Sequence, residues 1–171
     1  MKTIYLLRHA KSSWDQPGLP DHERPLAPRG EKAAPVMGRH LGDAGLVPER
    51  VLCSTARRAR QTWEAVAPYL SPAPEVTYRR DIYDAEGHHL LEILRELPAE
   101  TGSTMLVGHN PAMADLAEML VDGGDAAARE RMAAKYPTAA LAEIAAEVPR
   151  WVDLAQGAGR LVRFDRPKDV A

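Results

Sequence analysis

Three short segments of the chain hold side chains that together could bind and transfer a phosphoryl group. Arg8 and His9 follow one apolar run, and His109 follows another. Arg58 lies near the start of an amphipathic segment that comes after a third apolar run. A neutral imidazole nitrogen can attack phosphorus, and guanidinium groups can pair with phosphoryl oxygens. These residues therefore predict phosphoryl transfer through a covalent phosphohistidine.

The three segments each follow a predicted strand, at residues 3–7, 51–53 and 104–107. Apolar spacing predicts helices at about 31–44 and 59–70 and a further helix from about Glu86. Strands that alternate with helices favour an α/β fold with a largely parallel sheet. Ligands of such sheets bind beyond the carboxyl ends of the strands, so these ends are where the site is expected.

The remaining segments give weaker predictions. Asn110 is expected to cap a helix whose first residue is Pro111. A turn is predicted at residues 122–125 and a last strand at 161–164, while residues 138–147 are compatible with either a helix or a strand. Residues 15–30 hold four prolines and two glycines and are predicted to form a loop without regular structure.

Three arginines compete for the same role after the third apolar run. Arg58 lies beside the buried stripe at the start of the predicted helix, where the helix dipole and a guanidinium fork both favour an anion. Arg57 and Arg60 are expected to be solvated surface charges. The sequence therefore favours Arg58 as the second arginine of the site.

No motif for a metal or a nucleotide loop is found in the sequence. It contains no Gly-x-x-x-x-Gly-Lys segment and no carboxylate cluster with clear metal-ligand spacing. His88 and His89 are adjacent, and neighbours on a helix are not expected to face the same way. We therefore expect neither a metal nor another cofactor.

Composition limits the class of protein. The 171 residues carry 22 Lys and Arg against 24 Asp and Glu, a formal net charge of −2, which argues against a dedicated nucleic-acid binder. The single cysteine, Cys53, excludes an internal disulfide framework and fits a reducing cytoplasm. No apolar run approaches the length of a membrane helix, and the run near the N-terminus is too short for a signal peptide.

The three segments together resemble the histidine phosphatase (phosphoglycerate-mutase-like) superfamily. Residues 7–14 (LRHAKSSW) resemble its Arg-His-Gly signature, residues 54–62 (STARRARQT) its second block and residues 107–111 (VGHNP) its third. The short chain and the Arg-His-Ala-Lys-Ser form are most similar to the SixA-type phosphohistidine phosphatases. Residues 21–30 (DHERPLAPRG) and the ending around 159–167 are similar to that branch as well.

The resemblance implies a fold and roles for single residues. The fold would be a three-layer α/β/α sandwich with a mostly parallel central sheet, formed by residues 1–171 as a single domain. His9 would be the nucleophile, and Arg8, Arg58 and His109 would complete the phosphate pocket. Ala10 departs from the family's usual glycine and would be strained if that position needs a positive φ.

Other site residues are less sharply indicated. Ser12 and Ser54 could contact the phosphate, although capping and packing would explain them equally well. Asp84 could protonate the leaving group, with a cap for the helix near Glu86 as the alternative. Lys11, Arg24 and Arg29 could form a rim that meets an acidic or phosphorylated protein, or could be solvated loop charges.

The resemblance implies a cofactor-independent phosphatase of protein phosphohistidine. Two alternatives stay open: a phosphatase of small phosphomonoesters with the same site, and a phosphate-binding module without turnover. The expected partners are a phosphorylated protein or a small phosphomonoester, with a phosphate ion in the site, and neither nucleic acid nor a membrane.

Overall fold

A seven-stranded sheet forms the centre of the computed structural model, which describes all residues from 1 to 171. Its strands are β1 (Lys2–Arg8), β2 (Arg50–Ser54), β3 (Glu75–Arg79), β4 (Ser103–Gly108), β5 (Val121–Gly124), β6 (Leu141–Ala146) and β7 (Gly159–Asp165). They lie in the order β3-β2-β4-β1-β6-β7-β5. Only β6 is antiparallel to its neighbours, so the other strands end at the same edge of the sheet.

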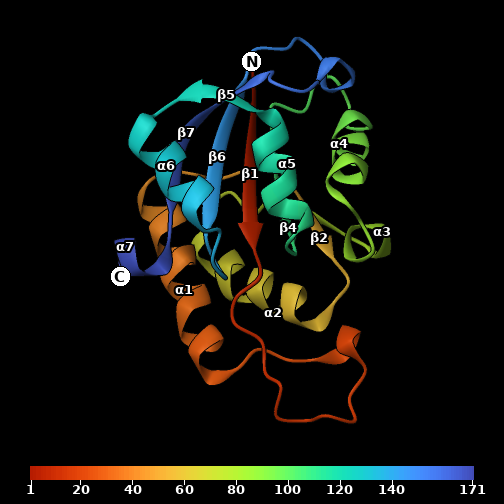
Figure 1. The fold of residues 1–171 in the computed structure, drawn as a ribbon, viewed down its shortest axis with the longest axis vertical. Helices are drawn as coiled ribbons and strands as arrows, with labels where there is room; N and C mark the ends of the chain where they lie inside the picture. Colours follow the sequence, from red (N-terminus) through yellow and green to blue (C-terminus); the bar gives the residue numbers. More distant parts are fainter.

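Helices cover both faces of this sheet (Figure 1). They are α1 (Pro28–Asp43), α2 (Arg57–Val66), α3 (Arg80–Tyr83), α4 (Gly87–Arg95), α5 (Ala112–Leu120), α6 (Ala126–Ala134) and α7 (Pro167–Val170). Short 3-10 helices occur at Asp21–Glu23, Ala67–Tyr69 and Trp151–Asp153. None of the helices is both long and apolar enough to span a membrane.

The alternation of side chains along β1 shows how the layers are built. Ile4 and Leu6 belong to one apolar cluster, together with residues of α4, α5 and α6. Tyr5 and Leu7 belong to the other cluster, with residues of α1 and α2. Successive residues of a strand face opposite sides, so a continuous apolar run is buried on both faces. The predicted three-layer α/β/α arrangement with a mostly parallel sheet is confirmed.

Two predictions for the C-terminal part are settled by sheet pairing. The ambiguous residues 138–147 contain β6, which pairs with β1 and β7 on either side. The turn predicted at 122–125 is wrong, because residues 121–124 form the edge strand β5. Gly124 has a φ of +106°, and a Cβ there would lie 2.2 Å from the carbonyl oxygen of Leu161. Glycine therefore lets β5 approach β7, a contact that local turn chemistry does not predict.

The predicted helix starts also shift. Helix α1 begins at Pro28 rather than Glu31, and the preceding loop holds a 3-10 turn and a backbone bridge between Ser12 and Leu26. Helix α5 begins at Ala112, with Pro111 as its cap residue rather than its first helical residue. The side chain of Asn110 still accepts from a helix N–H, that of Ala114, at 3.2 Å. The predicted cap interaction is therefore displaced by one position.

Candidate active site

The two histidines meet because their strands are adjacent and in register. Arg8 at the end of β1 lies opposite Gly108 at the end of β4, and the next residue of each strand is a histidine. The His9 N–H donates to the Gly108 carbonyl at 3.0 Å, and the ring centroids of His9 and His109 lie 5.1 Å apart. The expected convergence of the first and third segments is therefore observed.

The surroundings of His9 leave one ring nitrogen free to react. Its side chain is buried, and Nδ1 lies 2.7 Å from the Ala10 carbonyl oxygen, which can only accept a hydrogen bond. The proton is therefore assigned to Nδ1, which leaves the lone pair on Nε2. Burial is the main cause that lowers the pKa of His9 to about 4; the positive charges of Arg58, Arg8 and Arg24 act in the same direction, and the Ala10 hydrogen bond opposes them. At neutral pH the ring is uncharged.

His109 is held by Ser54 at the end of β2. Its Nε2 lies 2.8 Å from the Ser54 hydroxyl oxygen, which itself accepts from the Ala56 N–H at 3.1 Å. The Ser54 hydroxyl can then donate to His109 Nε2, and on this basis the ring proton is assigned to Nδ1. Burial, followed by the effect of His9, lowers the pKa of His109 to about 3. Ser54 therefore contacts a site histidine, as well as capping the backbone of the following turn.

Arg8 lies against the loop that precedes β6. Its terminal NH1 donates to the Tyr136 carbonyl at 2.9 Å. The Ala139 N–H donates to the carbonyls of both Arg8 and His9 at 3.0 Å, with Ala139 in the left-handed region at a φ of +62°. These bonds secure the backbone where β1 ends. Arg8 and His9 can therefore both belong to the site, although adjacent residues of a strand face opposite sides.

Arg58, and neither of its neighbouring arginines, is the buried one. It lies in the first turn of α2, whereas Arg57 is exposed and Arg60 donates to the Thr55 carbonyl at 2.9 Å. NH1 of Arg58 donates to the Asp21 carbonyl at 2.8 Å, and NH2 donates to the Asp21 carboxylate at 3.1 Å. The choice of Arg58 from its position beside the apolar stripe agrees with its burial.

Only three buried side-chain polar atoms in the chain have no hydrogen-bond partner. They are Nε of Arg8, Nε of Arg58 and Nδ1 of His109. Buried polar atoms without a partner are rare and costly in folded proteins. All three belong to residues predicted to form the phosphate pocket, and all three can donate. This concentration of unused donors is the property expected of an anion site.

The sequence did not indicate several residues that surround this pocket. The Asp21 carboxylate accepts from Arg24 at 3.0 Å and from the Tyr83 hydroxyl at 2.6 Å, besides its bond with Arg58. The Tyr83 bond is the largest of the effects that lower the pKa of Asp21 to about 2. Thr62 accepts from the Ala10 N–H at 2.9 Å and so ties the first segment to α2. Asp21 comes from the 15–30 loop, which lacks the periodicity that would place it. Arg24, expected on a rim or as a solvated charge of the same loop, is instead buried.

Two of the predicted residues have no such contacts. Asp84 is exposed and forms a 3.6 Å ion pair with Arg80, and it contacts neither histidine. It does not cap α4 either, since the cap residue is Glu86. Ser12 is buried and bridges Leu26 through its backbone, without a side-chain hydrogen bond to a site residue. Neither of these geometries supports a part in the chemistry.

A separate group of ligand-type side chains lies at the start of α4. His88 and His89 do face one another, contrary to expectation, with ring centroids 4.0 Å apart. Two contacts of Glu86, at the first turn of the helix, hold the two rings together. Its backbone N–H donates to His89 Nδ1 at 3.0 Å, and its carboxylate lies 3.5 Å from His88 Nδ1. All three residues are exposed, and none contacts the candidate site.

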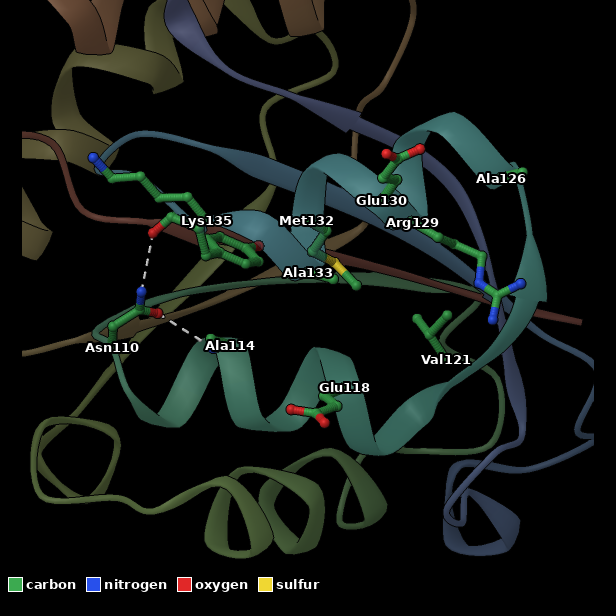
Figure 2. Close-up of a pocket in the computed structure, with 11 residues that line it drawn as sticks. Asn110, Ala114, Glu118, Val121, Ala126, Arg129, Glu130, Met132, Ala133 and Lys135 are labelled. Carbon is green, nitrogen blue, oxygen red and sulfur yellow. Dashed lines mark hydrogen bonds between the residues drawn. The ribbon is translucent and has the colours of Figure 1, made fainter.

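The largest cavity lies beside the histidines rather than around them. It has a volume of about 560 Å³ and runs between α5 and α6 (Figure 2). Its charged lining residues are of both signs: Glu118, Arg129, Glu130 and Lys135. At one end Asn110 donates to the Tyr136 carbonyl at 3.0 Å, and this same carbonyl accepts from Arg8. The cavity therefore adjoins the site without containing its histidines.

Two histidines, the buried Arg58 and the half-buried Arg8 thus lie together at the carboxyl edge of this α/β sheet, an arrangement suited to binding a phosphoryl group. The family model described as histidine phosphatase superfamily (branch 1) matches residues 4–122. The chain belongs to this superfamily. The four residues expected in the pocket, Arg8, His9, Arg58 and His109, all lie within the matched segment.

Relatives and solved structures agree with this assignment. The uncharacterized protein Rv1276c of Mycobacterium tuberculosis is 37% identical over 164 residues, covering 95% of this chain and all of that protein. A candidate phosphohistidine phosphatase SixA from Agrobacterium tumefaciens superposes with a TM-score of 0.79 at 30% identity, covering 97% of this chain and 98% of that one. A SixA candidate from Nakamurella multipartita has the same TM-score at 29% identity, with 97% and 96% coverage. The chain is thus SixA-type in its fold and motifs.

Proposed function

We propose that the protein is a phosphohistidine phosphatase that works through a phosphorylated His9. The lone pair of His9 Nε2 forms a bond to phosphorus as the bond from phosphorus to the substrate imidazole breaks. The leaving nitrogen keeps the electron pair and takes a proton from water. A water molecule then attacks phosphorus, the bond to His9 breaks and its electron pair returns to Nε2. The proton lost by this water neutralises the hydroxide left by the first step, and inorganic phosphate and neutral His9 are released.

The observation that carries this proposal is the set of unpartnered buried donors. Nε of Arg8, Nε of Arg58 and Nδ1 of His109 surround a histidine whose own lone pair is free. Such donors stabilise the charge on the oxygens of a phosphoryl group in transfer. A module that only binds phosphate would not need a neutral histidine with its Nε2 unpaired. The charge is balanced by protein side chains, so we propose that the reaction needs no metal or other cofactor.

The absence of a placed acid fits a phosphoramidate substrate. Asp21 is the carboxylate that contacts the site, and its low pKa keeps it ionised as an acceptor for Arg58. It therefore serves to position Arg58 rather than to donate a proton. Imidazole is a much weaker base than an alkoxide and leaves phosphorus with less help. This difference favours phosphohistidine over a phosphomonoester as the substrate.

The test is the release of inorganic phosphate from a protein phosphorylated on histidine. The wild-type protein is compared with His9→Ala and with His88→Ala, whose histidine is exposed and away from the site. We expect release by the wild type and by His88→Ala, and none above background by His9→Ala. Retained activity in His9→Ala would exclude the mechanism.

A small aryl phosphate run in parallel separates the alternatives. Release from the aryl phosphate alone, dependent on His9, would make the protein a phosphatase of small phosphomonoesters. Phosphopeptide binding without hydrolysis, unchanged in His9→Ala, would make it a binding module. Acid-labile phosphate on a peptide containing residue 9, found by mass spectrometry, would support the covalent intermediate.

Three further expectations belong to this proposal. The continuous sheet from Lys2 to Asp165 supports a single domain over residues 1–171. The one buried cysteine, Cys53, supports a reducing compartment such as the cytoplasm. The net charge of −2 supports a protein or small-molecule partner rather than nucleic acid.

A further inference from the structure

A second pocket near the site is lined almost entirely by basic and small residues. It has a volume of about 240 Å³, and we call it the basic pocket. Its charged lining residues are all cations: Lys11, Arg29, Lys135, Arg166 and Lys168. Ala33, Pro137, Thr138 and Pro167 complete the lining, so no carboxylate contributes to it. A chain with a net charge of −2 thus gathers five positive charges in one small concavity.

The basic pocket lies at the same sheet edge as the histidines. Lys11 is two residues beyond His9, and Thr138 directly precedes Ala139, whose N–H bonds the carbonyls of Arg8 and His9. The strand register brings the end of β7 to this edge as well, because Leu7 of β1 pairs with Leu141 of β6, which pairs with Asp165 of β7. Residues 166–168 follow directly, and in Figure 1 α7 lies beside α1 at the end toward which β1 points.

Most of these cations have no partner within the chain. Arg166 is paired with the Asp169 carboxylate at 2.7 and 2.8 Å. No ion pair is formed by the other four, which are exposed: Lys11, Arg29, Lys135 and Lys168. Scattered surface charges of mixed sign are ordinary and need no explanation. Like charges that converge in a concave site instead repel one another and raise the local concentration of anions.

The construction of the pocket distinguishes the kind of anion. The candidate phosphoryl site holds the buried Arg58 and the half-buried Arg8 through hydrogen bonds, whereas the basic pocket presents three lysines and Arg29 as long, exposed side chains. Separate mobile point charges suit several carboxylates spread along a segment better than a single phosphate. We propose that the basic pocket binds an acidic segment of the protein whose phosphohistidine enters the His9 site.

This inference rests on the proposed function and deepens it, since it assigns the protein substrate a chemical character. It predicts that the acidic segment contributes to substrate affinity and association and not to the chemical step. Contacts between exposed charges are individually weak and are screened by salt. The effect should therefore appear mainly in KM and should shrink as ionic strength rises.

The test uses two kinds of phosphohistidine peptide, one with a run of Glu and one with a run of Gln beside the phosphorylated residue. Each kind is made in two forms, with the run either before or after that residue. The double variant Arg29→Gln/Lys168→Gln removes two unpaired charges of the basic pocket. The control Arg50→Gln/Arg160→Gln changes the net charge equally at the opposite edge of the sheet, where β2 and β7 begin. Para-nitrophenyl phosphate reports on the His9 site alone.

We expect the double variant to lose about three- to ten-fold in kcat/KM on the preferred Glu peptide at low salt, chiefly through KM. Its rates on the Gln peptide and on para-nitrophenyl phosphate should match those of the wild type, and the control should match throughout. Addition of about 0.5 M NaCl should remove nearly all of the difference in kcat/KM between the double variant and the wild type. Equal losses on the Glu and Gln peptides, or no loss on either, would overturn the proposal.

The failure of the proposed function would be seen separately. If no phosphate is released from either peptide, the unphosphorylated Glu peptide is titrated against the wild type and both double variants by fluorescence anisotropy. Weaker binding by Arg29→Gln/Lys168→Gln alone would still support an acidic ligand in the basic pocket. Equal affinity for all three proteins would refute it.

Discussion

Burial is expected to keep His9 neutral at pH values where an ordinary histidine is already protonated. Its pKa is lowered from 6.5 to about 4, first by burial and then by Arg58, Arg8 and Arg24. The difference corresponds to about 3 kcal/mol in favour of the neutral ring. At pH 5.5 about 97% of His9 should be neutral, against about 10% of a histidine with the unperturbed pKa.

The assay is a histidine NMR titration of the folded protein, with the His9 signals assigned by their loss in His9→Ala. The same chain in denaturant gives the reference midpoint. Removal of a nearby charge in Arg24→Ala should raise the His9 midpoint, whereas Arg39→Ala, on α1, should leave it unchanged. The lowered pKa also makes stability depend on pH. Between about pH 6.5 and 4 the unfolded chain binds a proton at His9 and the folded chain does not. The free energy of unfolding should therefore fall as the pH falls through that range.

A His9 midpoint close to that of the denatured chain would refute the reasoning. The ring would then be largely protonated at mildly acidic pH, and its burial would not prepare a nucleophile. A low midpoint that fails to move in Arg24→Ala would support burial as the cause and exclude the contribution of that charge.

Two further variants test the pocket and its support. Arg58→Ala should lower kcat/KM by about 10²- to 10³-fold, because it removes donors to the phosphoryl oxygens. Arg57→Ala changes the exposed neighbouring arginine and should lower kcat/KM little. Equal losses in a steady-state assay would mean that the wrong arginine is assigned. Gly30→Ala should lower the free energy of unfolding by about 1–3 kcal/mol, because the new Cβ would lie 2.2 Å from the Lys11 carbonyl oxygen. In the control Gly18→Ala, the new Cβ meets nothing within 4 Å. Denaturant titrations that give equal free energies of unfolding for the two variants would contradict the clash.

The sequence carried enough information to predict the layers and the core of the site. Continuous apolar runs such as residues 3–7 mark strands buried on both faces, and the amphipathic stripe of α2 marks the side on which Arg58 lies. Since parallel strands end at one edge, the order of these elements already brings His9 and His109 together. The register of β1 and β4 then confirms their contact.

The remaining features depend on contacts between distant parts of the chain. Asp21 and Tyr83 are 62 residues apart and meet only because the loop after β1 lies against the first turn of α2 and the end of α3. No local pattern indicates such a pair. Strand β5 likewise exists because Gly124 fits against Leu161, and its residues alone resemble a turn. Asp84 was attractive for its residue type and its place in the chain, but it lies beyond α3, where its side chain meets Arg80 and solvent.

The single reversed strand, β6, brings the last part of the chain to the edge of the sheet where the histidines lie. Because β6 runs against its neighbours, the loop before it and the end of β7 reach the edge where β1 ends. The four residues expected in the phosphate pocket all lie within residues 4–122, which match the family model, whereas Lys135, Arg166 and Lys168 of the basic pocket lie after them. Substitutions at these three positions could therefore change the charge of the basic pocket without replacing any of the four residues expected in the phosphate pocket.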